Sequence, residues 1–384
     1  MSLEASTNLR TAIESSIGQP FIEGNSIKAM RNGVEIFPEM LRAIEEATRS
    51  IDCVTFIYWT GDIARAFAHA LAGRAREGVN VRVILDDFGS RPMDDRLIAS
   101  MTSAGVQVEK FRPVIRRKFW ESDHRTHRKI LIVDESIGFT GGVGIAEEWE
   151  GDARGPSEWR DTHFRIAGPA VLALRAAFLT DWRDCGHVLE AADVAIPTPE
   201  PAGDVELAVL DGSAQIGFNN VERAYEALIA VATDRILIQT PYFNPVAGLS
   251  DLLVAAVNRG VEVAILIPGP FADKRVSLIP AEDALVPLVG AGVQLWVYQP
   301  TMMHTKALLV DGQMSLIGSV NFNRRSVEKD EEVAVAALDA TLTQRLETDF
   351  REDVKQSKPV EADISRPWRR RIAALLLRPF NSEF

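Results

Sequence analysis

Two short segments of the chain carry the same reactive residue types at the same spacing. The residues are His127, Lys129 and Asp134 in HRKILIVD, and His304, Lys306 and Asp311 in HTKALLVD. Residues two apart on a strand share a face, so each His is expected to point the same way as its Lys. An imidazole beside an ammonium group suits attack on phosphorus, because the imidazole can act as nucleophile or acid and the cation attracts phosphate oxygens.

A single copy of this pattern is weak evidence, since a His and a Lys also occur together on exposed strand edges. The two copies, however, are each followed at the same offset by a small-residue pair, Gly141-Gly142 in the first and Gly318-Ser319 in the second. Two copies with identical internal spacing favour a chemical role over chance.

The composition is that of a folded protein with material for two domains or halves. The chain has 384 residues, of which 46% are apolar, and a formal charge of −12. This charge disfavours a nucleic-acid partner, since phosphate polyanions are repelled. The two cysteines show no metal-ligand spacing. We find no signal-peptide pattern and no apolar run of roughly 18 to 20 residues, and therefore expect a cytoplasmic protein without a membrane span.

Strand-like and helix-like segments alternate in both halves of the chain. A strand is predicted over Ile51–Trp59, a helix over Ile63–Arg76, and then the strand VNVRVILD; the same order returns after residue 205. REGVNVRVILDDFG is answered by NRGVEVAILIPGP, and SAGVQVEKF by GAGVQLWVY. The βαβα order predicts an α/β fold with a mixed, largely parallel sheet and helices on its faces, duplicated with pseudo-two-fold symmetry. The predicted divisions are an extension (1–24), a first domain (25–190), a linker (191–204), a second domain (205–355) and a C-terminal tail (356–384).

The paired motifs resemble the signature of the phospholipase D superfamily, in which His, Lys and Asp are followed, after six intervening residues, by Gly-Ser and then by Asn. Within that superfamily the chain resembles the bacterial cardiolipin synthases. The supporting phrases include FPEMLRAIEEATRSID, WRDTHFRIAGPAV, YQPTMMHTKALLVDG and IGSVNFNRRSVEKDEE, and the resemblance covers about residues 25–335. It implies two phospholipase D-like βαβα sandwich domains that build one active site, so a monomer already holds a complete site.

The resemblance also implies roles for individual residues. His127 is expected to attack phosphorus and form a phosphohistidine, and His304 to act as acid and then as base. The remaining members of the site are Lys129 and Lys306 on the phosphate oxygens, and Ser319 and Asn321 as further donors to the phosphate. Asp161 lies 34 residues after His127 and Glu332 lies 28 residues after His304, and from these similar spacings we expect each carboxylate to orient the histidine of its own half. No metal or cofactor is required, because the lysines supply the positive charge.

Several of these assignments leave an alternative open. Asp134 and Asp311 occupy the catalytic signature, but each sits where a strand meets a turn and suits a bond to local backbone. Tyr242 and Phe243 in TPYF are expected at the mouth of the site, or else in the core. The first copy also departs from the family, which usually has Gly-Gly followed after one residue by Asn, because Gly144 stands at the place of that Asn. Gly142 and Gly144 thus stand where Ser319 and Asn321 stand in the second copy, and Asp330 replaces a frequent Asn.

Two segments combine basic and aromatic residues and suggest a membrane surface as partner. FRPVIRRKFWESDHR contains Arg116, Arg117, Phe119 and Trp120, and RPWRRRIAALLLRPF contains Trp368. Cations that meet anionic headgroups and aromatics that enter the acyl boundary are typical of peripheral proteins. The alternatives are a solvated loop for the first and docking on the catalytic domain for the second.

The leading hypothesis is a phosphatidyltransferase that moves a phosphatidyl group from one phosphatidylglycerol to another and acts peripherally at the inner face of the cell membrane. A phospholipase D that uses water as acceptor has the same motifs and is the main alternative. A superfamily nuclease fits less well, because those are typically one-motif dimers and this chain is acidic. A non-catalytic membrane-binding protein is disfavoured by intact His and Lys in both copies.

Overall fold

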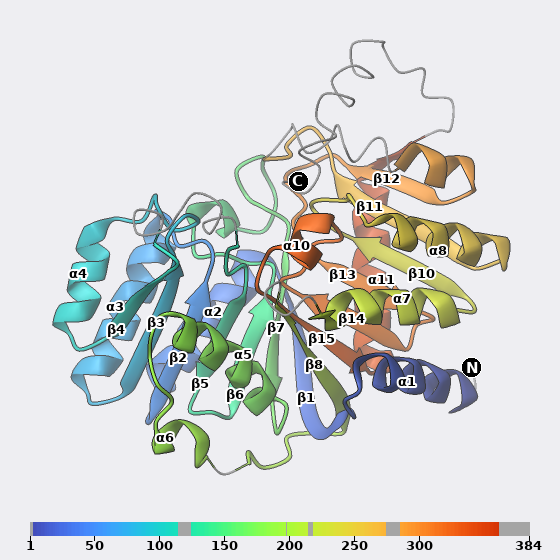
Figure 1. Cartoon of the computed structure of the whole chain (residues 1–384). Helices are drawn as coiled ribbons and strands as arrows, with labels where there is room; N and C mark the ends of the chain where they lie inside the picture. The colour runs from blue at the N-terminus through green and yellow to red at the C-terminus, as the bar shows by residue number, and fades with distance from the viewer. Residues whose placement is uncertain (1–2, 114–123, 197, 214–217, 274–284, 361–384) are drawn as a thin grey trace.

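The computed structural model describes residues 3–113, 124–196, 198–213, 218–273 and 285–360. Within them the strands form one sixteen-stranded sheet in the order β16-β12-β11-β10-β13-β14-β15-β8-β1-β7-β6-β5-β2-β3-β4, with β9 paired to β8 (Figure 1). From the centre outward the order is the same on both sides, so that β7, β6, β5, β2, β3 and β4 correspond to β15, β14, β13, β10, β11 and β12. The predicted duplication is confirmed.

The strands of the first half are β1 (Ile22–Arg31), β2 (Ser50–Thr55), β3 (Asn80–Asp86), β4 (Gln107–Phe111), β5 (Lys129–Val133), β6 (Ile137–Gly141) and β7 (Thr162–Ala167). Those of the second half are β8 (Val205–Ser213), β9 (Phe218–Asn219), β10 (Arg235–Gln239), β11 (Glu262–Pro268), β12 (Gln294–Tyr298), β13 (Ala307–Val310), β14 (Met314–Gly318), β15 (Glu332–Leu338) and β16 (Ser357–Pro359). The two halves join at β1, whose early residues pair with β8 and whose later residues pair with β7.

The prediction of a largely parallel sheet is wrong. Among the described strands only β2 with β3, β3 with β4, β10 with β11 and β11 with β12 pair in parallel. The strands that carry the two motifs belong to antiparallel runs, β5-β6-β7 and β13-β14-β15. Short turns such as VDES and VDGQ reverse the chain directly, whereas a parallel pair needs a long crossover.

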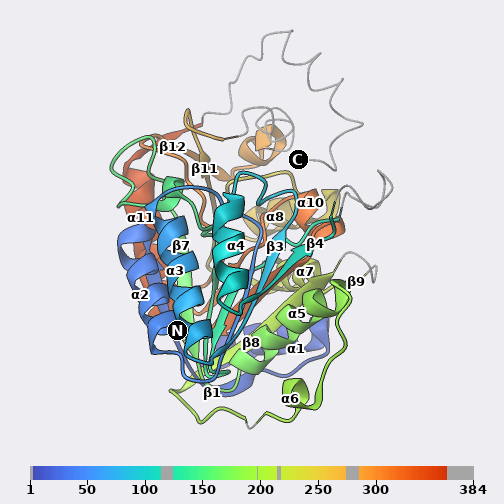
Figure 2. The same ribbon diagram turned by 90° about the vertical axis from the view of Figure 1, so that its left-hand side faces the viewer.

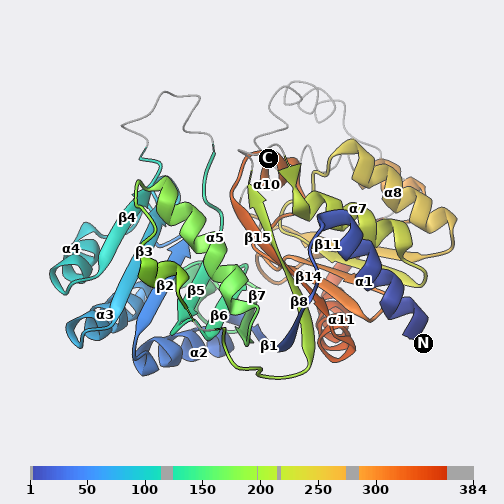
Figure 3. The same cartoon turned by 60° about the horizontal axis from the view of Figure 1, so that its bottom comes forward.

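Helices cover both faces of the sheet, as Figures 1, 2 and 3 show. In the first half they are α2 (Asn32–Glu46), α3 (Asp62–Arg76), α4 (Asp95–Ser103), the 3-10 helix η3 (Glu147–Trp149), α5 (Val171–Asp184) and the short α6 (Ala191–Val194). In the second half they are α7 (Asn220–Val231), α8 (Ala247–Asn258), α10 (Arg324–Glu328) and α11 (Ala340–Lys355), and α1 (Leu3–Ile17) packs against α7. The first residues of the chain thus contribute Leu9 and Ile13 to the core of the second half.

Apolar side chains on α2, α3 and α4 pack on one face of the first half, and those on α1, α7 and α8 on one face of the second. A third cluster contains residues of α5 and α11 and draws strand residues from both halves, which ties the halves together around the site. None of the helices in the described part of the chain is long and apolar enough to span a bilayer.

Candidate active site

The two motif histidines are held by the opposite half of the molecule. The backbone N–H of His127 donates to the carbonyl of Glu331 at 2.8 Å, and that of His304 donates to the carbonyl of Arg160 at 2.7 Å. Each histidine therefore lies beside a chain segment of the other half, across the pseudo-two-fold axis. His127 lies beside Glu331, just before β15, and His304 lies beside Arg160, just before β7. Residues more than 140 positions apart in the sequence are brought into one site by these contacts.

The carboxylates that orient the histidines are exchanged between the halves. His127 Nδ1 lies 2.9 Å from Glu332 Oε1, and His304 Nδ1 lies 2.8 Å from Asp161 Oδ2. Sequence spacing related each acid to the histidine of its own half, and the structure shows the reverse. A carboxylate on Nδ1 fixes the ring and its tautomer, so that Nε2 is the nitrogen left for chemistry.

The two lysines are buried beside their histidines. Lys129 Nζ lies 3.1 Å from His127 Nε2, and Lys306 Nζ lies 3.3 Å from His304 Nε2; both also donate to the carbonyl of the histidine. Burial lowers the pKa of Lys129 to about 8 and that of Lys306 to about 7, against the raising effect of Glu332 and Asp161. Weakly solvated ammonium groups of this kind are suited to bind an anion that enters the site.

The surroundings of the two histidines differ. Burial, together with the Lys306 cation, lowers the pKa of His304 to about 4. Its ring packs against Trp149 and Trp159, each with its centroid 5.2 Å away. The His127 side chain is 12% exposed against 4% for His304, and its ring contacts Phe56 at 5.1 Å. His304 is therefore a neutral, buried imidazole in the free protein.

The two orienting carboxylates also differ. Burial raises the pKa of Glu332, although Lys129 opposes the shift. Burial acts on Asp161 in the same direction, but its interactions with His304 and Lys306 and a bond from Trp149 outweigh it, and the pKa of Asp161 is lowered. The exchange of carboxylates thus places a strongly ionised acid on His304 and a more readily protonated one on His127.

The Ser319 side chain contacts the carboxylate of Glu332. Its hydroxyl donates to Glu332 Oε2 at 2.5 Å, and it accepts a bond from the Val333 N–H at 3.1 Å. The expectation that Ser319 reaches the phosphate directly is therefore corrected, because its hydroxyl is already committed to the orienting carboxylate. In the first half the Trp149 indole N–H donates to Asp161 Oδ2 at 2.8 Å and supplies the corresponding bond.

This substitution of donors explains the glycine at position 142. A Cβ on Gly142 would lie 2.2 Å from Asp161 Oδ1. A Cβ on Gly144 would lie 2.8 Å from Ile57 Cβ and 3.1 Å from Trp149. Asp161 thus occupies the space that a serine at position 142 would need, and Ile57 and Trp149 occupy the space that an asparagine at position 144 would need. The two motifs are unequal because their orienting carboxylates are fixed by different partners.

Gly142→Ser, which copies the second motif into the first, is expected to lower turnover by about 100-fold. The new side chain must displace Asp161, and a misplaced orienting group costs orders of magnitude in rate. The measurement is kcat on phospholipid vesicles. Ser319→Ala is the matched variant: it removes one donor to Glu332 without a clash and is expected to cost less than about 10-fold. Wild-type activity in Gly142→Ser would contradict this explanation.

Asn321 is buried on α10's side of the site. Its Nδ2 lies 3.3 Å from Ser326 Oγ, and its Oδ1 has no hydrogen-bond partner among the described residues. Asp330 forms a two-point ion pair with Arg325, at 3.1 and 3.2 Å, so the carboxylate that replaces the family's frequent Asn is neutralised locally.

Asp134 and Asp311 lie at the far ends of their strands. Asp134 accepts bonds from the backbone N–H groups of Thr48, Arg49 and Ser50, and Asp311 from those of Thr233, Asp234 and Arg235. The five residues of β5 separate Asp134 from His127 by about 16 Å of strand. The catalytic expectation for these two aspartates is therefore corrected: they fix the start of β2 and of β10.

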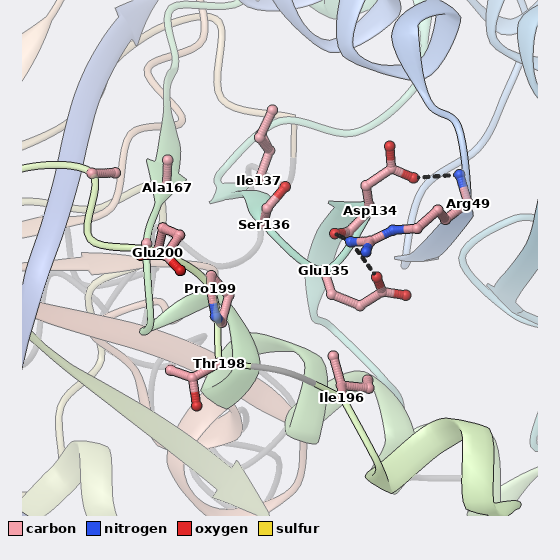
Figure 4. A pocket seen from close by; sticks show the side chains of 12 residues that line it. Arg49, Asp134, Glu135, Ser136, Ile137, Ala167, Ile196, Thr198, Pro199 and Glu200 are labelled. Carbon is pink, nitrogen blue, oxygen red and sulfur yellow. Dashed lines mark hydrogen bonds and ion pairs between the residues drawn. The ribbon is translucent and has the colours of Figure 1, made fainter.

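Figure 4 shows the surroundings of Asp134, where Arg49 and Glu135 form an ion pair at 3.0 Å. A cavity of about 460 Å³ lies here, between the turn that follows β5 and residues of the linker such as Thr198 and Pro199. It lies at the opposite end of β5 from the histidines and is separate from the catalytic groups.

Asp311→Ala is expected to destabilise the fold by about 2–4 kcal/mol, because it leaves several backbone donors without their charged acceptor and places Ala at a positive φ of 53°. Asp134→Ala is expected to cost about half as much, since water reaches the exposed Thr48 and Arg49 more easily than the buried Asp311. Chemical denaturation of the two variants measures both. Equal, near-zero effects would contradict the structural role.

The structure separates the two residues of TPYF. Tyr242 donates its hydroxyl to Asp273 Oδ2 at 2.6 Å, and Asp273 raises the pKa of Lys306, so Tyr242 lies near the site. Phe243 is 2% exposed and stacks on Phe322 in the core of the second half. The expectation that Phe243 binds substrate is corrected, since its ring is enclosed by apolar side chains.

Sequence reasoning missed the aromatic residues around the histidines, namely Phe56, Trp149 and Trp159. Phe56 could have been found, because it follows the strand that corresponds to the one before TPYF. The tryptophans lie in the connection between β6 and β7, which is longer than its counterpart between β14 and β15. The predicted membrane contacts Arg116, Arg117, Phe119, Trp120 and Trp368 fall outside the described residues. In the part of the chain that is described, no group of three or more His, Cys, Asp or Glu is arranged to hold a metal ion.

A family model described as cardiolipin synthase, phospholipase D-like domain, matches residues 40–148 and 225–354. These two segments contain the two motifs, one in each half. The match confirms the resemblance that the paired motifs indicated.

Similar proteins match over nearly the whole chain. Cardiolipin synthase 1 of Bacillus cereus is 32% identical over 368 residues, which cover 93% of this chain and 72% of that protein. The major cardiolipin synthase of Bacillus subtilis is 31% identical, with 88% and 70% covered. The crystal structure of phosphatidylserine synthase from Haemophilus influenzae has the same fold, with a TM-score of 0.74, 15% identity and 97% of each chain covered. The chain therefore belongs to the phospholipase D-like cardiolipin synthase family.

Proposed function

We propose that the protein synthesises cardiolipin by transferring a phosphatidyl group from one phosphatidylglycerol to another, with release of glycerol. The observation that carries the proposal is the convergence of two His-Lys pairs on one site, each histidine oriented by a carboxylate of the other half. Two imidazoles allow a nucleophile and an acid to act on one phosphodiester at once. Relatives named cardiolipin synthases support the choice of substrate.

In the first step, the Nε2 lone pair of His127 attacks phosphorus, the bond from phosphorus to the glycerol oxygen breaks, and His304 gives that oxygen its proton. In the second step, the hydroxyl of another phosphatidylglycerol gives its proton to His304 and attacks phosphorus, and the P–N bond to His127 breaks. Lys129 and Lys306 stabilise the negative charge of both transition states. Proton count and charge return to their starting values after the two steps.

His304 must gain a proton before it can act as the acid. In the free site its pKa is about 4, because of burial and Lys306. A phosphodiester anion bound between the lysines offsets the charge of Lys306 and attracts the imidazolium, so it raises this pKa although the ring stays buried. Substrate binding therefore favours the protonated form of His304, which can act as the acid.

Sulfate, an anion that keeps its charge across this range, is expected to bind more tightly as the pH falls from 9 to 5. Between pH 9 and 7 the gain follows protonation of Lys129 and Lys306, whose pKa values are about 8 and about 7. Below that, the bound anion raises the pKa of His304, so binding takes up a proton and affinity rises by up to about 10-fold per pH unit. Titration calorimetry measures affinity and proton uptake together.

His304→Asn is the control for this pH series, since it should remove the gain below pH 7 and leave the upper part. An affinity that does not depend on pH would contradict the role of all three groups.

The decisive assay incubates the purified protein with phosphatidylglycerol vesicles and resolves the lipids. Cardiolipin with an equal amount of released glycerol supports the transferase. Phosphatidic acid as the sole product would instead support a phospholipase D, which shares every step up to the acceptor. No lipid turnover would contradict both.

We further propose that the protein works as a monomer, because one chain supplies both halves of the site. We also propose that it acts at the inner face of the cell membrane, since its proposed substrate is a phospholipid.

A further inference from the structure

Two phenylalanines are exposed to solvent although most aromatic side chains of the described residues are buried. Phe88 is 55% exposed and Phe271 is 38% exposed, and the other large apolar side chains exposed in the described part of the chain are valines. One exposed apolar side chain needs no explanation, so the placement of these two relative to the site decides whether they form an interaction surface.

The two phenylalanines occupy corresponding places in the two halves. Phe88 stands two residues after the end of β3, and Phe271 three residues after the end of β11, its counterpart. β3 and β11 both end at the edge of the sheet where the motif histidines lie, that is, at the start of the motif strands. This follows because β2 is parallel to its neighbour β3 and antiparallel to β5. One exposed ring therefore lies on each side of the catalytic end.

Each phenylalanine belongs to a loop that contacts the surroundings of the site. The Ser90 hydroxyl donates to the Phe56 carbonyl at 3.1 Å, and Phe56 packs on His127. Asp273 accepts the hydroxyl of Tyr242, and Ala272 packs in the same core cluster as Met302, two residues before His304. The rings thus flank the groups that carry the chemistry without touching them.

The loop of Phe88 is held in place. The backbone N–H groups of Phe88 and Gly89 both donate to Asp86 Oδ1 at 2.9 Å. The Arg91 guanidinium lies over the Phe88 ring, 5.1 Å from its centroid. A rigidly presented ring with a cation beside it matches the boundary between acyl chains and anionic headgroups.

We propose that Phe88 and Phe271 insert into the apolar boundary of a lipid bilayer and seat the catalytic end on it. This inference rests on the proposed function, in which the headgroup of a phospholipid must reach His127 and His304 while its acyl chains stay in the bilayer. Local apolar anchors are needed because a chain with a formal charge of −12 is repelled as a whole by an anionic surface.

The test uses the full chain and the double variant Phe88→Ser/Phe271→Ser. Binding is measured by sedimentation with vesicles made of equal parts phosphatidylglycerol and phosphatidylcholine. Turnover is measured on the same vesicles and on a short-chain phosphatidylglycerol dissolved as monomers. We expect vesicle binding and vesicle turnover to fall at least about 10-fold, while turnover of the monomeric lipid stays within about 2-fold of wild type.

Val194→Ser is the matched control. Val194 is 67% exposed, but it lies on α6 beside Asp193, which pairs with Arg82 near the start of β3, away from the catalytic end (Figure 1). This variant should bind vesicles like the wild type. Phe88→Trp/Phe271→Trp should bind at least as tightly as the wild type, which guards against a folding defect in the serine variant.

Unchanged vesicle binding in the serine double variant overturns the inference, and so does an equal loss on monomeric and vesicular lipid, which would assign the rings to the site itself. If the wild type turns over neither lipid but loses vesicle binding with the two phenylalanines, the proposed function fails and the membrane contact stands.

Discussion

His127→Ala is expected to reduce turnover of phosphatidylglycerol by at least about 10⁴-fold, because no covalent intermediate can form without the nucleophile. The fold should be unaffected, since the His127 side chain is partly exposed and its main structural tie is a backbone bond to Glu331. Lipid turnover and thermal unfolding, measured on the same preparation, check both parts.

Loss of activity alone does not tell a nucleophile from an acid, so the assignment needs a substrate that requires no acid. A phosphodiester with a p-nitrophenolate leaving group departs without protonation. His304→Asn should still release one equivalent of p-nitrophenol in a burst and then stall, with the phosphoryl group on His127. His127→Asn should show no burst.

The reverse pattern, a burst in His127→Asn and none in His304→Asn, would exchange the roles of the two histidines. The low pKa of His304 makes this test worthwhile, because a neutral imidazole at pH 7 has the protonation state that a nucleophile also requires.

The two motifs and the repeated phrases can be found directly in the sequence, and with the family resemblance they were sufficient to predict one site built from two copies. The sequence also located α3 to within one residue, because its apolar periodicity and the glycine that follows it are local as well. The share of parallel strands was overestimated, because the βαβα order describes only β2 to β4 and β10 to β12 and is silent on the hairpins that carry the motifs.

Contacts across the pseudo-two-fold axis could not be predicted. The position of Asp161 in the sequence does not show that it orients His304, because pairing Asp161 with His127 or with His304 would satisfy the same chemical requirement. The positions of Ser319 and Trp149 as alternative donors to the two carboxylates depend on two corresponding connections, β14 to β15 and β6 to β7, that differ in length. The sequence does not show why Gly142 stands where the second copy has Ser319; the reason is that a Cβ at position 142 would lie 2.2 Å from Asp161 Oδ1.

Glu332→Gln is expected to lower the rate of phosphohistidine formation by about 10²- to 10⁴-fold, by analogy with the loss that follows when an orienting carboxylate of a catalytic histidine becomes an amide. An amide at this place can donate to Nδ1 and favour the wrong tautomer, which leaves Nε2 protonated and unable to attack. Burst amplitude and rate with the p-nitrophenyl substrate measure the effect.

Asp161→Asn should leave that burst nearly intact and instead slow the reaction with phosphatidylglycerol, in which His304 must protonate glycerol. The cross-half pairing can be observed directly by NMR of the histidine rings in protein labelled with ¹⁵N-histidine. Glu332→Gln should shift the ring signals of His127, in the first half, and leave those of His304 close to wild type; Asp161→Asn should do the opposite.

Glu109→Gln is the matched control for the NMR experiment, because Glu109 lies 3.0 Å from His187 Nε2 in a pair remote from the site. It should move the signals of His187 alone. If Glu332→Gln perturbs His304 and spares His127, each carboxylate serves the histidine of its own half, and the exchanged arrangement is excluded. If it perturbs His127, the duplicated halves cannot act separately, because each one carries the group that prepares the other's histidine for chemistry.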